Sequence, residues 1–293
     1  MVDVIKIGGS ILSSIEDLDF CARKIACATY SKLPIIVVSA FKNYTDSLLK
    51  MNNYFSNTPS SFVITTGEQI TAGLLEIAIS KYGKKAKAMA GWQVPIIIGS
   101  QYENGMLVET QKLEALLAQG IMPIITGFQG VDDDFNIKDL GRGGSDLTAV
   151  ALAKAFNGKC VLLKKSGGVC SADPNLIDEC FVWSHVGYDD LVHLAESGSR
   201  VIQKEALVVA KDGKVPLKVT NLDFATQTDI NTCDSEFWSV LAYGNKLRIV
   251  TNKLMQKIKD YGFSFHDNYY EVEVQNDLRK SAHEVYALCK RYL

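Results

Sequence analysis

The stretch LGRGGSDLTAVALAKAF, residues 140–156, is the most informative part of this sequence. Three glycines, an arginine, a serine and an aspartate are packed into residues 140–146. Glycine loses more conformational entropy on folding than any other residue, so such a cluster indicates that the backbone comes close to another group. The run rich in Ala and Leu that follows predicts a helix, with Ser145 or Asp146 as its N-cap. The stretch is therefore either an anion site at a helix N-terminus or an ordinary capped helix after a tight turn.

The composition is that of a globular protein. With 293 residues, of which 47% are hydrophobic and 22% charged, the chain is long enough for one large domain or two ordinary ones. A net charge of −2 and the lack of any Lys/Arg-rich block argue against a nucleic-acid partner. Seven cysteines without a CxxC pair and four histidines without paired spacing predict reduced thiols and no metal site.

The first residues, MVDVIKIGGS, lack the basic start and the long apolar run of a signal peptide. We also find no stretch that approaches the ~20 apolar residues of a membrane helix. A cytoplasmic location without a membrane partner is therefore expected.

Short apolar, β-branched runs alternate with helical stretches along most of the chain. We predict strands over 2–7, 33–41, 121–130, 159–165 and 215–221, and helices over 67–83 and 147–156. Continuous apolar runs separated by helices are typical of parallel strands that are covered on both faces. The sequence thus predicts an α/β fold, a three-layer sandwich with a mostly parallel central sheet. Ligands bind at the carboxyl ends of the strands in such sheets.

The pattern changes near residue 231, where NTCDSE (231–236) predicts a polar linker. After it we expect a strand over 237–243, a helix over 251–262, strands around 263–267 and 268–275, and a helix over 276–293. We therefore divide the chain into a domain over 1–230 and a small α+β module over 235–293. So small a module carries little core alone, so we expect it to pair with its copy in a homodimer.

Four short motifs lie where the predicted elements end or begin. KIGGS (6–10) follows the first strand without the spacing of a Walker A loop, and VVSAFKNYTD (37–46) offers hydroxyl groups at a strand end. GEQ (67–69) opens a helix, and KKSGGVCSADPN (164–175) follows a strand. Each motif alone has an ordinary explanation as a turn, a polar loop or a helix start.

Taken in this order, the motifs resemble the amino acid kinase family and, within it, the aspartate kinases. That family shows KxGGT/S, VVSA with a downstream Thr, GE opening a helix, a GF…G stretch before LGRGGSD, and TDVDGVYTADPR. The segment YDDLVHLAESGSRVIQKEAL (188–207) is also similar to the family's SYDEMLELA..GAKVLHPRA. The resemblance covers about residues 1–230. The tail resembles one ACT-like module of the kind that aspartate kinases carry in pairs.

The resemblance implies transfer of a phosphoryl group from ATP, with Mg²⁺ bound to the nucleotide, to the β-carboxylate of L-aspartate. It makes Lys6 and Asp146 the catalytic residues, with Asp146 either orienting Lys6 or helping to hold Mg²⁺. The fork of Arg142 suits bidentate binding of a carboxylate, and Glu68 suits the substrate ammonium. The implied substrate-binding residues are Ser39, Thr45, Glu68, Phe128, Arg142, Gly144 and Ser145. The implied nucleotide-binding residues are Gly8, Gly9, Ser10, Lys164, Lys165, Gly168, Ser171, Asp173, Pro174, Asn175 and Arg200.

The sequence departs from the family pattern on the nucleotide side. Lys164 and Lys165 replace the Thr-Asp pair, Asn175 replaces an Arg and Arg200 replaces a Lys. Cys170 replaces a Tyr, and Gln203-Lys204 replaces His-Pro. Either the two lysines supply the lost phosphate contacts, or ATP binds weakly, or another nucleotide is the donor. In the aspartate kinases, feedback sites for lysine or threonine normally need paired ACT modules. The tail resembles a single module, so classical feedback inhibition is not predicted from the sequence.

Three functions remain compatible with the sequence. The first is an ATP-dependent aspartate kinase with an altered nucleotide pocket. The second is a related small-molecule kinase that acts on another amino acid. The third is a non-catalytic subunit that binds an amino acid, against which the intact Lys6, Arg142 and Asp146 argue.

Overall fold

A computed structural model describes residues 1–94, 96–102, 106–232, 236–251, 262–266, 269–274 and 277–292. Its central sheet has the strand order β10-β12-β11-β9-β1-β2-β6-β3, and β11 and β12 form the antiparallel pair in an otherwise parallel sheet. The strands are β1 (Val4–Ile7), β2 (Ile35–Val38), β3 (Ala86–Met89), β6 (Met122–Thr126), β9 (Cys160–Leu163), β10 (His185–Gly187), β11 (Leu217–Thr220) and β12 (Gln227–Asn231).

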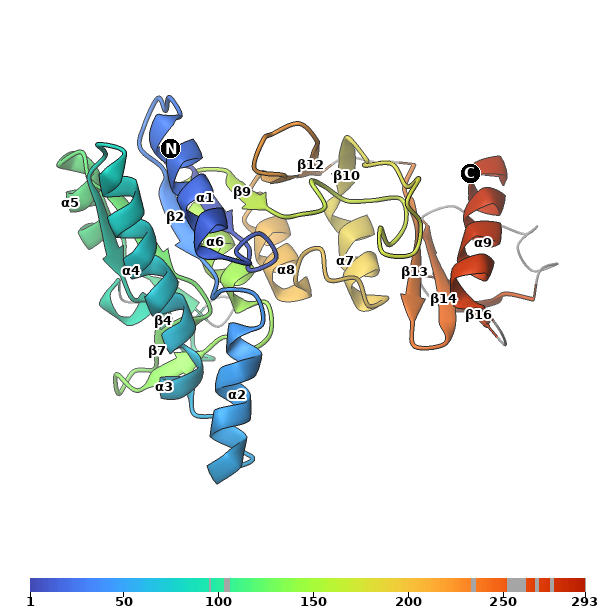
Figure 1. Ribbon diagram of the computed structural model, residues 1–293, viewed down its shortest axis with the longest axis horizontal. Helices are drawn as coiled ribbons and strands as arrows, with labels where there is room; N and C mark the ends of the chain where they lie inside the picture. Colours follow the sequence, from blue (N-terminus) through green and yellow to red (C-terminus); the bar gives the residue numbers. More distant parts are fainter. Residues whose placement is uncertain are drawn as a thin grey trace.

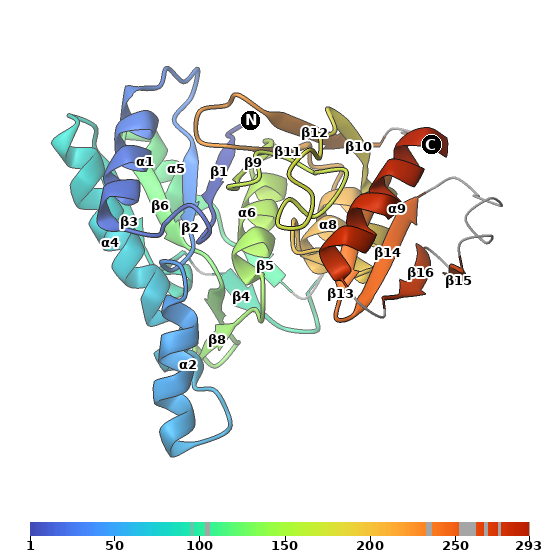
Figure 2. The ribbon, with the colours of Figure 1, turned by 45° about the vertical axis from the view of Figure 1, so that its right-hand side comes forward.

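Two apolar cores lie on opposite faces of this sheet. Successive strand residues point to opposite faces, so Val4 joins one core and Ile5 the other. One core packs under α1 (Ile15–Cys27) and α4 (Thr66–Lys81). The other packs under α5 (Gln111–Ala118), α6 (Gly144–Ala155), α7 (Tyr188–Glu196) and α8 (Lys204–Asp212). The predicted three-layer sandwich is confirmed, and Figure 2 shows helices on both sides of the sheet.

The strand predicted over 121–130 is interrupted. The backbone of Phe128 has a φ of 72°, the left-handed region that non-glycine residues rarely adopt, and it turns the chain out of the sheet after Thr126. The chain then enters a second sheet, of order β5-β4-β7-β8, which the sequence analysis missed. Its strands are β4 (Ile96–Ile98), β5 (Met106–Val108), β7 (Gln129–Val131) and β8 (Ile137–Asp139).

Helix α6 begins earlier than the sequence predicted. Gly143 is its N-cap, with a φ of 79°, so neither Ser145 nor Asp146 takes that place. Both side chains are buried in the first turn of α6 instead. The glycine therefore allows the tight entry into the helix, while the polar residues of the first turn remain directed into the protein.

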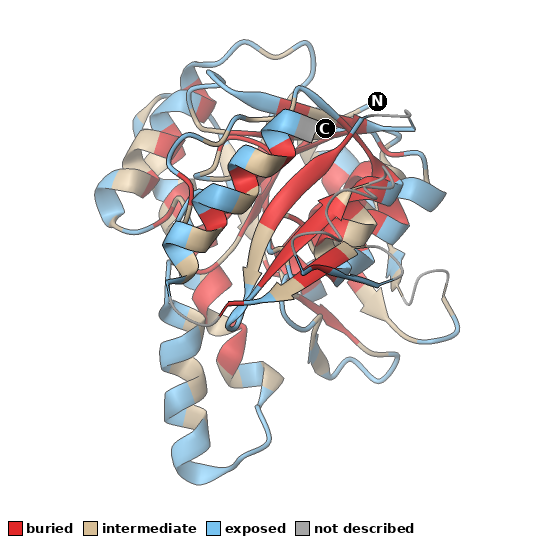
Figure 3. Cartoon of the chain, turned by 90° about the vertical axis from the view of Figure 1, so that its right-hand side faces the viewer, coloured by how far each residue is buried: buried red, intermediate tan, exposed pale blue. Residues whose placement is uncertain are grey.

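In the described residues, the C-terminal module is an antiparallel sheet of order β13-β14-β16-β15 with a helix packed on it. Its elements are β13 (Trp238–Tyr243), β14 (Lys246–Thr251), β15 (Ser264–His266), β16 (Tyr269–Glu273) and α9 (Leu278–Tyr292). Strand β14 was not predicted. The helix predicted over 251–262 falls on residues 252–261, which lie outside the described part of the chain. Figure 3 shows buried strands beneath helices whose outer faces are exposed.

The module shares its core with the preceding domain. Ala172 and Ile177 belong to the same apolar cluster as Trp238 and Tyr286. Ala172 also forms a parallel bridge with Val240 of β13. The loop after β9 is thereby attached to the C-terminal sheet, a contact between segments that are distant in the sequence.

The remaining helices lie beside the amino-terminal half. Helix α2 (Tyr44–Phe55) has no buried residue and projects from the body (Figure 1). The other two are α3 (Ser61–Ile64) and a 3₁₀ turn, η1 (Gly91–Gln93). Contrary to the sequence expectation, the helical run Ser61–Lys81 is long and apolar enough to cross a membrane by length and composition alone. Half of its most apolar window is buried inside the protein, and core helices pass the same test.

Candidate active site

Lys6, Asp146 and Lys164 form a compact charged cluster. The Nζ of Lys6, in β1, lies 2.7 Å from Oδ1 of Asp146 as an ion pair without hydrogen-bond alignment. The Nζ of Lys164, directly after β9, donates a hydrogen bond of 2.8 Å to Oδ2. The three side chains are only 6%, 5% and 15% exposed, in that order. The structure therefore brings the predicted catalytic pair together and adds Lys164, which was predicted only as a nucleotide residue.

The electrostatics of the cluster favour an anion. Burial alone would raise the pKa of Asp146, but the attraction of Lys164 and Lys6 outweighs it and lowers that pKa to about 2. Burial lowers the pKa of Lys164, and Asp146 opposes the change. Two lysine side chains thus share one carboxylate in a centre with little access to water, which strengthens its attraction for negative groups.

The acidic side chains of the described residues bear on the role of Asp146. Among the described residues no group of three His, Cys, Asp or Glu side chains could hold a metal ion. Each carboxylate oxygen of Asp146 lies beside one lysine, Oδ1 beside Lys6 and Oδ2 beside Lys164. The arrangement fits a role of Asp146 in orienting Lys6, and its predicted role in holding Mg²⁺ stays a prediction.

Glycine-rich backbone surrounds the cluster. The loop Gly8-Gly9-Ser10 follows β1, and a Cβ at Gly9 would lie 2.9 Å from the carbonyl oxygen of Ala40 at the end of β2. Gly8 is the neighbour of Lys164, because Ile7 pairs with Leu163 in the parallel sheet. Asp146 occupies the first turn of α6, and a helix N-terminus favours anions.

Glu68 lies in the first turn of α4 and is 3% exposed. Its Oε1 accepts a hydrogen bond of 3.0 Å from the backbone N–H of Ala40, while its buried Oε2 has no hydrogen-bond partner. Burial raises the pKa of Glu68 to about 7, against the opposing effects of the Ala40 hydrogen bond and Lys6. A buried carboxylate oxygen without a partner is costly unless a ligand satisfies it.

The other predicted substrate residues lie around the start of α6. A Cβ at Gly127 would come within 2.6 Å of Ser145, and one at Gly144 would lie 3.3 Å from Phe128. The GFQG and GGSD stretches are therefore packed directly against each other. Ser39 and Thr45 are half-buried at the end of β2 and the start of α2.

Arg142 is exposed, whereas Lys6, Glu68 and Asp146 are buried. Within the described part of the chain, no side chain pairs with its guanidinium. Its backbone is held instead, since the carbonyl of Arg142 accepts a hydrogen bond from the side-chain amide of Gln203. Its charged group is thus available to a ligand.

Two residues that sequence reasoning missed support this loop. The hydroxyl of Thr148 accepts a hydrogen bond of 3.2 Å from the N–H of Phe128 and donates one of 3.0 Å to the carbonyl of Gly144. Gln203 was noticed only as a departure from the family pattern. No sequence signal links either residue to the site, because both act through contacts between separate elements.

The predicted nucleotide residues fall into two groups. Gly8, Gly9, Ser10 and Lys164 lie at the charged cluster or beside it, and Lys165 is the exposed neighbour of Lys164. Arg200 is exposed in the loop between α7 and α8. The remaining group, Gly168 to Asn175, runs toward the C-terminal module.

That second group makes structural contacts. Ser171 is buried, and its hydroxyl lies 3.0 Å from the hydroxyl of Tyr286 in α9 and accepts a hydrogen bond from the N–H of Phe181. Asp173 accepts hydrogen bonds from the backbone and side chain of Asn175, beside the exposed Pro174. Gly168 packs against Val182 and Thr228. These contacts attach Ser171 to α9, and its predicted role in nucleotide binding stays a prediction.

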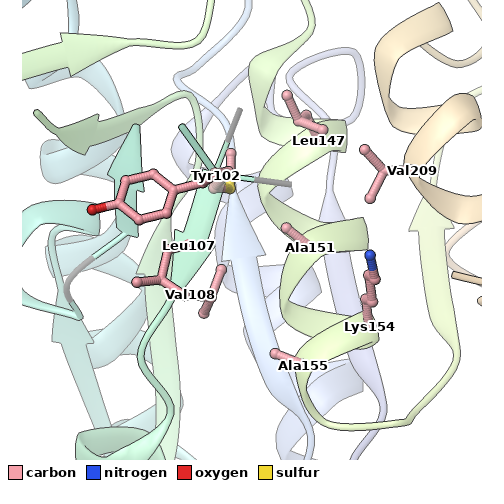
Figure 4. Close-up of a pocket in the computed structure, with 9 residues that line it drawn as sticks. Tyr102, Leu107, Val108, Leu147, Ala151, Lys154, Ala155 and Val209 are labelled. Atoms are coloured by element: carbon pink, nitrogen blue, oxygen red, sulfur yellow. The ribbon is translucent and has the colours of Figure 1, made fainter. Parts of the chain in front are cut away.

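The structure also contains a cavity of about 330 Å³ between β5, α6 and α8 (Figure 4). Its lining residues are Tyr102, Met106, Leu107, Val108, Leu147, Ala151, Lys154, Ala155 and Val209. None of the predicted site residues lines it, so it is separate from the charged cluster.

The sequence and the fold are both similar to those of aspartate kinases. The chain is 35% identical over 222 residues to the aspartokinase of Geobacillus stearothermophilus, covering 73% of this chain and 54% of that protein. It spans about half the length of the curated relatives that it matches. Its fold is similar to the crystal structure of the Synechocystis aspartate kinase, with a TM-score of 0.70 at 23% identity over 100% of this chain and 56% of that one. E. coli aspartokinase III in complex with aspartate and ADP also has a TM-score of 0.70, at 14% identity, over 98% of this chain and 83% of that one.

The family assignment depends on the sequence match rather than on the fold alone. The amino acid kinase family matches residues 1–221, which include both lysines and the aspartate of the charged cluster. The chain belongs to the amino acid kinase family.

Proposed function

We propose that this chain transfers the γ-phosphoryl group of ATP to the β-carboxylate of L-aspartate, giving 4-phospho-L-aspartate and ADP. The observation that carries the proposal is the buried cluster of Lys6, Asp146 and Lys164 beside two glycine-rich loops. Phosphoryl transfer needs positioning and charge stabilisation rather than covalent participation of the protein. The helix and loop backbone provide the positioning. The buried centre, in which two lysines share one aspartate, provides the charge stabilisation.

The reaction is a single displacement. An oxygen of the β-carboxylate attacks the γ-phosphorus, and the bond from that phosphorus to the β–γ bridging oxygen breaks, leaving its electron pair on ADP. Lys6 and Lys164 stabilise negative charge on the oxygens between donor and acceptor, and Asp146 holds both ammonium groups in place. Mg²⁺ would arrive with the nucleotide and would neutralise triphosphate charge.

The acceptor side favours an amino acid. A free, buried carboxylate oxygen on Glu68 would repel a phosphate acceptor and would attract an ammonium group. The unpaired guanidinium of Arg142 can bind the α-carboxylate by two parallel hydrogen bonds. Aspartate, named in the E. coli complex, carries all three groups that this arrangement requires.

Turnover tests the proposal directly. The chain is incubated with ATP, Mg²⁺ and hydroxylamine, which traps an acyl phosphate as a hydroxamate, and with aspartate, glutamate or N-acetylglutamate as the acceptor. We expect hydroxamate and ADP to form with aspartate in equal amounts. Turnover only with another acceptor would support the second hypothesis, and aspartate binding without ADP formation would support a non-catalytic subunit.

A homodimer through the C-terminal module remains part of the proposal. Its support is that β15 is an edge strand whose residues are all exposed, and such edges pair readily with another chain. Sedimentation velocity of the chain tests this, and a monomer at micromolar concentration would contradict it.

A further inference from the structure

Arg248 of the C-terminal module makes a hydrogen bond to the end of α7. The guanidinium of Arg248 donates a hydrogen bond of 2.9 Å from Nη1 to the carbonyl of Ser197, the residue that caps α7. It donates a second of 2.7 Å from Nε to Glu271 in β16, and its Cζ lies 3.7 Å from the centroid of the Tyr243 ring and 4.6 Å from that of Tyr269. Arg248 is 9% exposed and Ser197 is fully buried.

This contact is specific rather than incidental. A cation at the C-terminus of a helix is favoured by the helix dipole. The planar guanidinium of a buried arginine also holds two hydrogen-bond partners in a fixed relative position. The next residue, Gly198, has a φ of 104°, and a Cβ there would lie 2.8 Å from the Tyr243 ring. Only glycine allows the chain to leave α7 so close to the module.

The segment that follows α7 ends beside the loop that contains Arg142. It runs from Ser197 to Gln203, which caps α8. Gln203 donates a hydrogen bond to the carbonyl of Arg142, and a Cβ at Gly143 would overlap its side chain. One seven-residue segment thus has the C-terminal module at one end and the backbone of Arg142 at the other.

We infer that Gln203 and Arg248 are positioning residues for Arg142, acting from opposite ends of the segment 197–203. The guanidinium of Arg142 has no partner of its own within the described residues, so its direction depends on its backbone. That backbone is held by Gln203, whose own place depends on the α7 end that Arg248 fixes. The role of Arg142 in binding the acceptor carboxylate belongs to the proposed function, and this inference rests on it.

The first test compares two residues of the same strand. Arg248→Met removes the hydrogen bond to Ser197. Lys246→Met removes another partner of Glu271, an Nζ that lies 2.7 Å from the carboxylate, and leaves the contact with α7 in place. We expect Arg248→Met to raise the KM and Kd for aspartate about 3- to 10-fold, the size of one hydrogen bond, with kcat within about twofold. Lys246→Met changes both constants by less than about twofold. Equal effects of the two variants would overturn the inference.

The second test acts from the other end. Gln203→Ala is expected to raise the KM for aspartate about 3- to 10-fold, and Gln203→Glu at least as much, because a carboxylate cannot donate to the Arg142 carbonyl. In the double variant Gln203→Ala/Arg248→Met the effects will not add, since both act on the same loop. Full additivity would show that the two residues act separately and would contradict the inference.

Hydrogen exchange gives a readout that is independent of turnover. In Arg248→Met and in Gln203→Ala, the amides of residues 141–146 are expected to exchange faster, while β13 and α9 keep their protection. If protection of β13 is also lost, Arg248→Lys replaces the first variant, because lysine cannot make both hydrogen bonds. Unchanged exchange of 141–146 overturns the inference even where turnover is normal. Faster exchange in a chain without turnover would support it while refuting the proposed function.

Discussion

Two regions on either side of Lys6 contain polar residues of similar kinds, but they use them differently. On the acceptor side, Oε2 of Glu68 has no partner and the guanidinium of Arg142 is unpaired among the described residues. In the segment 168–175, the hydroxyl of Ser171 is occupied by Tyr286, and Asp173 is occupied by Asn175. Buried polar groups are normally satisfied inside a protein, so the open oxygen of Glu68 indicates where a ligand binds, and the exposed guanidinium of Arg142 is accessible to it.

The cluster that separates the two regions should tolerate change least. Asp146→Asn leaves two lysines, nearly buried, without their counter-ion, so we expect kcat to fall by about 10³-fold and the free energy of unfolding to fall by about 3–5 kcal/mol. Urea denaturation and turnover measure the two effects. Asp223→Asn, which breaks the exposed pair with Lys24, is the control and costs less than about 1 kcal/mol. Equal costs would mean that Asp146 is not the organising residue.

Lys164 tests where the nucleotide side begins. Lys164→Thr introduces the residue that the family pattern shows there and is expected to lower kcat by about 10²-fold, because one cation aimed at the phosphoryl group is lost. Its neighbour Lys165 is exposed, so Lys165→Thr should change kcat by less than about twofold. Steady-state kinetics with both substrates decides. A larger effect at Lys165 would place the phosphates outside the cluster.

The acceptor side should respond to pH through Glu68. Its pKa is raised to about 7 by burial, so the free protein loses the ionised form as the pH falls below that value. We expect kcat/KM for aspartate to fall below pH 7 by roughly tenfold per pH unit, because the ammonium needs the ionised carboxylate. Glu68→Gln removes this dependence, whereas Glu76→Gln on the same helix retains it. An unchanged acid limb in Glu68→Gln would assign it to another group.

The polar groups of the segment 168–175 already have partners, so we expect substitutions there to lower the free energy of unfolding and to change the kinetic constants little. Ser171→Ala removes the contact with Tyr286, so the free energy of unfolding is expected to fall by about 1 kcal/mol, while the KM for ATP changes by less than about twofold. Thermal unfolding and ATP titration measure both. A large rise in the KM for ATP would show that Ser171 binds the nucleotide and would contradict the comparison.

Strands and helices could be predicted from the sequence where the apolar or helix-forming runs are long. The buried strands β1, β2, β9 and β11 and the helices α4 and α6 follow from continuous apolar or helix-forming stretches. The second sheet was missed because each of its strands has three residues, too few for a periodic pattern. Strand β14 was missed because it follows a tight hairpin at Gly244.

The candidate site divides in the same way. Lys6, Glu68 and Asp146 were predicted because intact motifs carry them. The pairing of Lys164 with Asp146 and of Ser171 with Tyr286 joins residues of separate elements, and no local pattern indicates such contacts. Gln203 acts on Arg142 from a loop 61 residues away, which only the folded chain brings close.

The central claim is that Lys6 faces the phosphoryl group during its transfer. The most direct measurement is the rate of hydroxamate formation from ATP and aspartate by the unaltered chain and by Lys6→Met, at saturating concentrations of both substrates. The account predicts that Lys6→Met lowers kcat by about 10²–10³-fold, because a cation that acts on the transition state is lost. Equal kcat values for the two proteins, or no turnover by the unaltered chain, would contradict it.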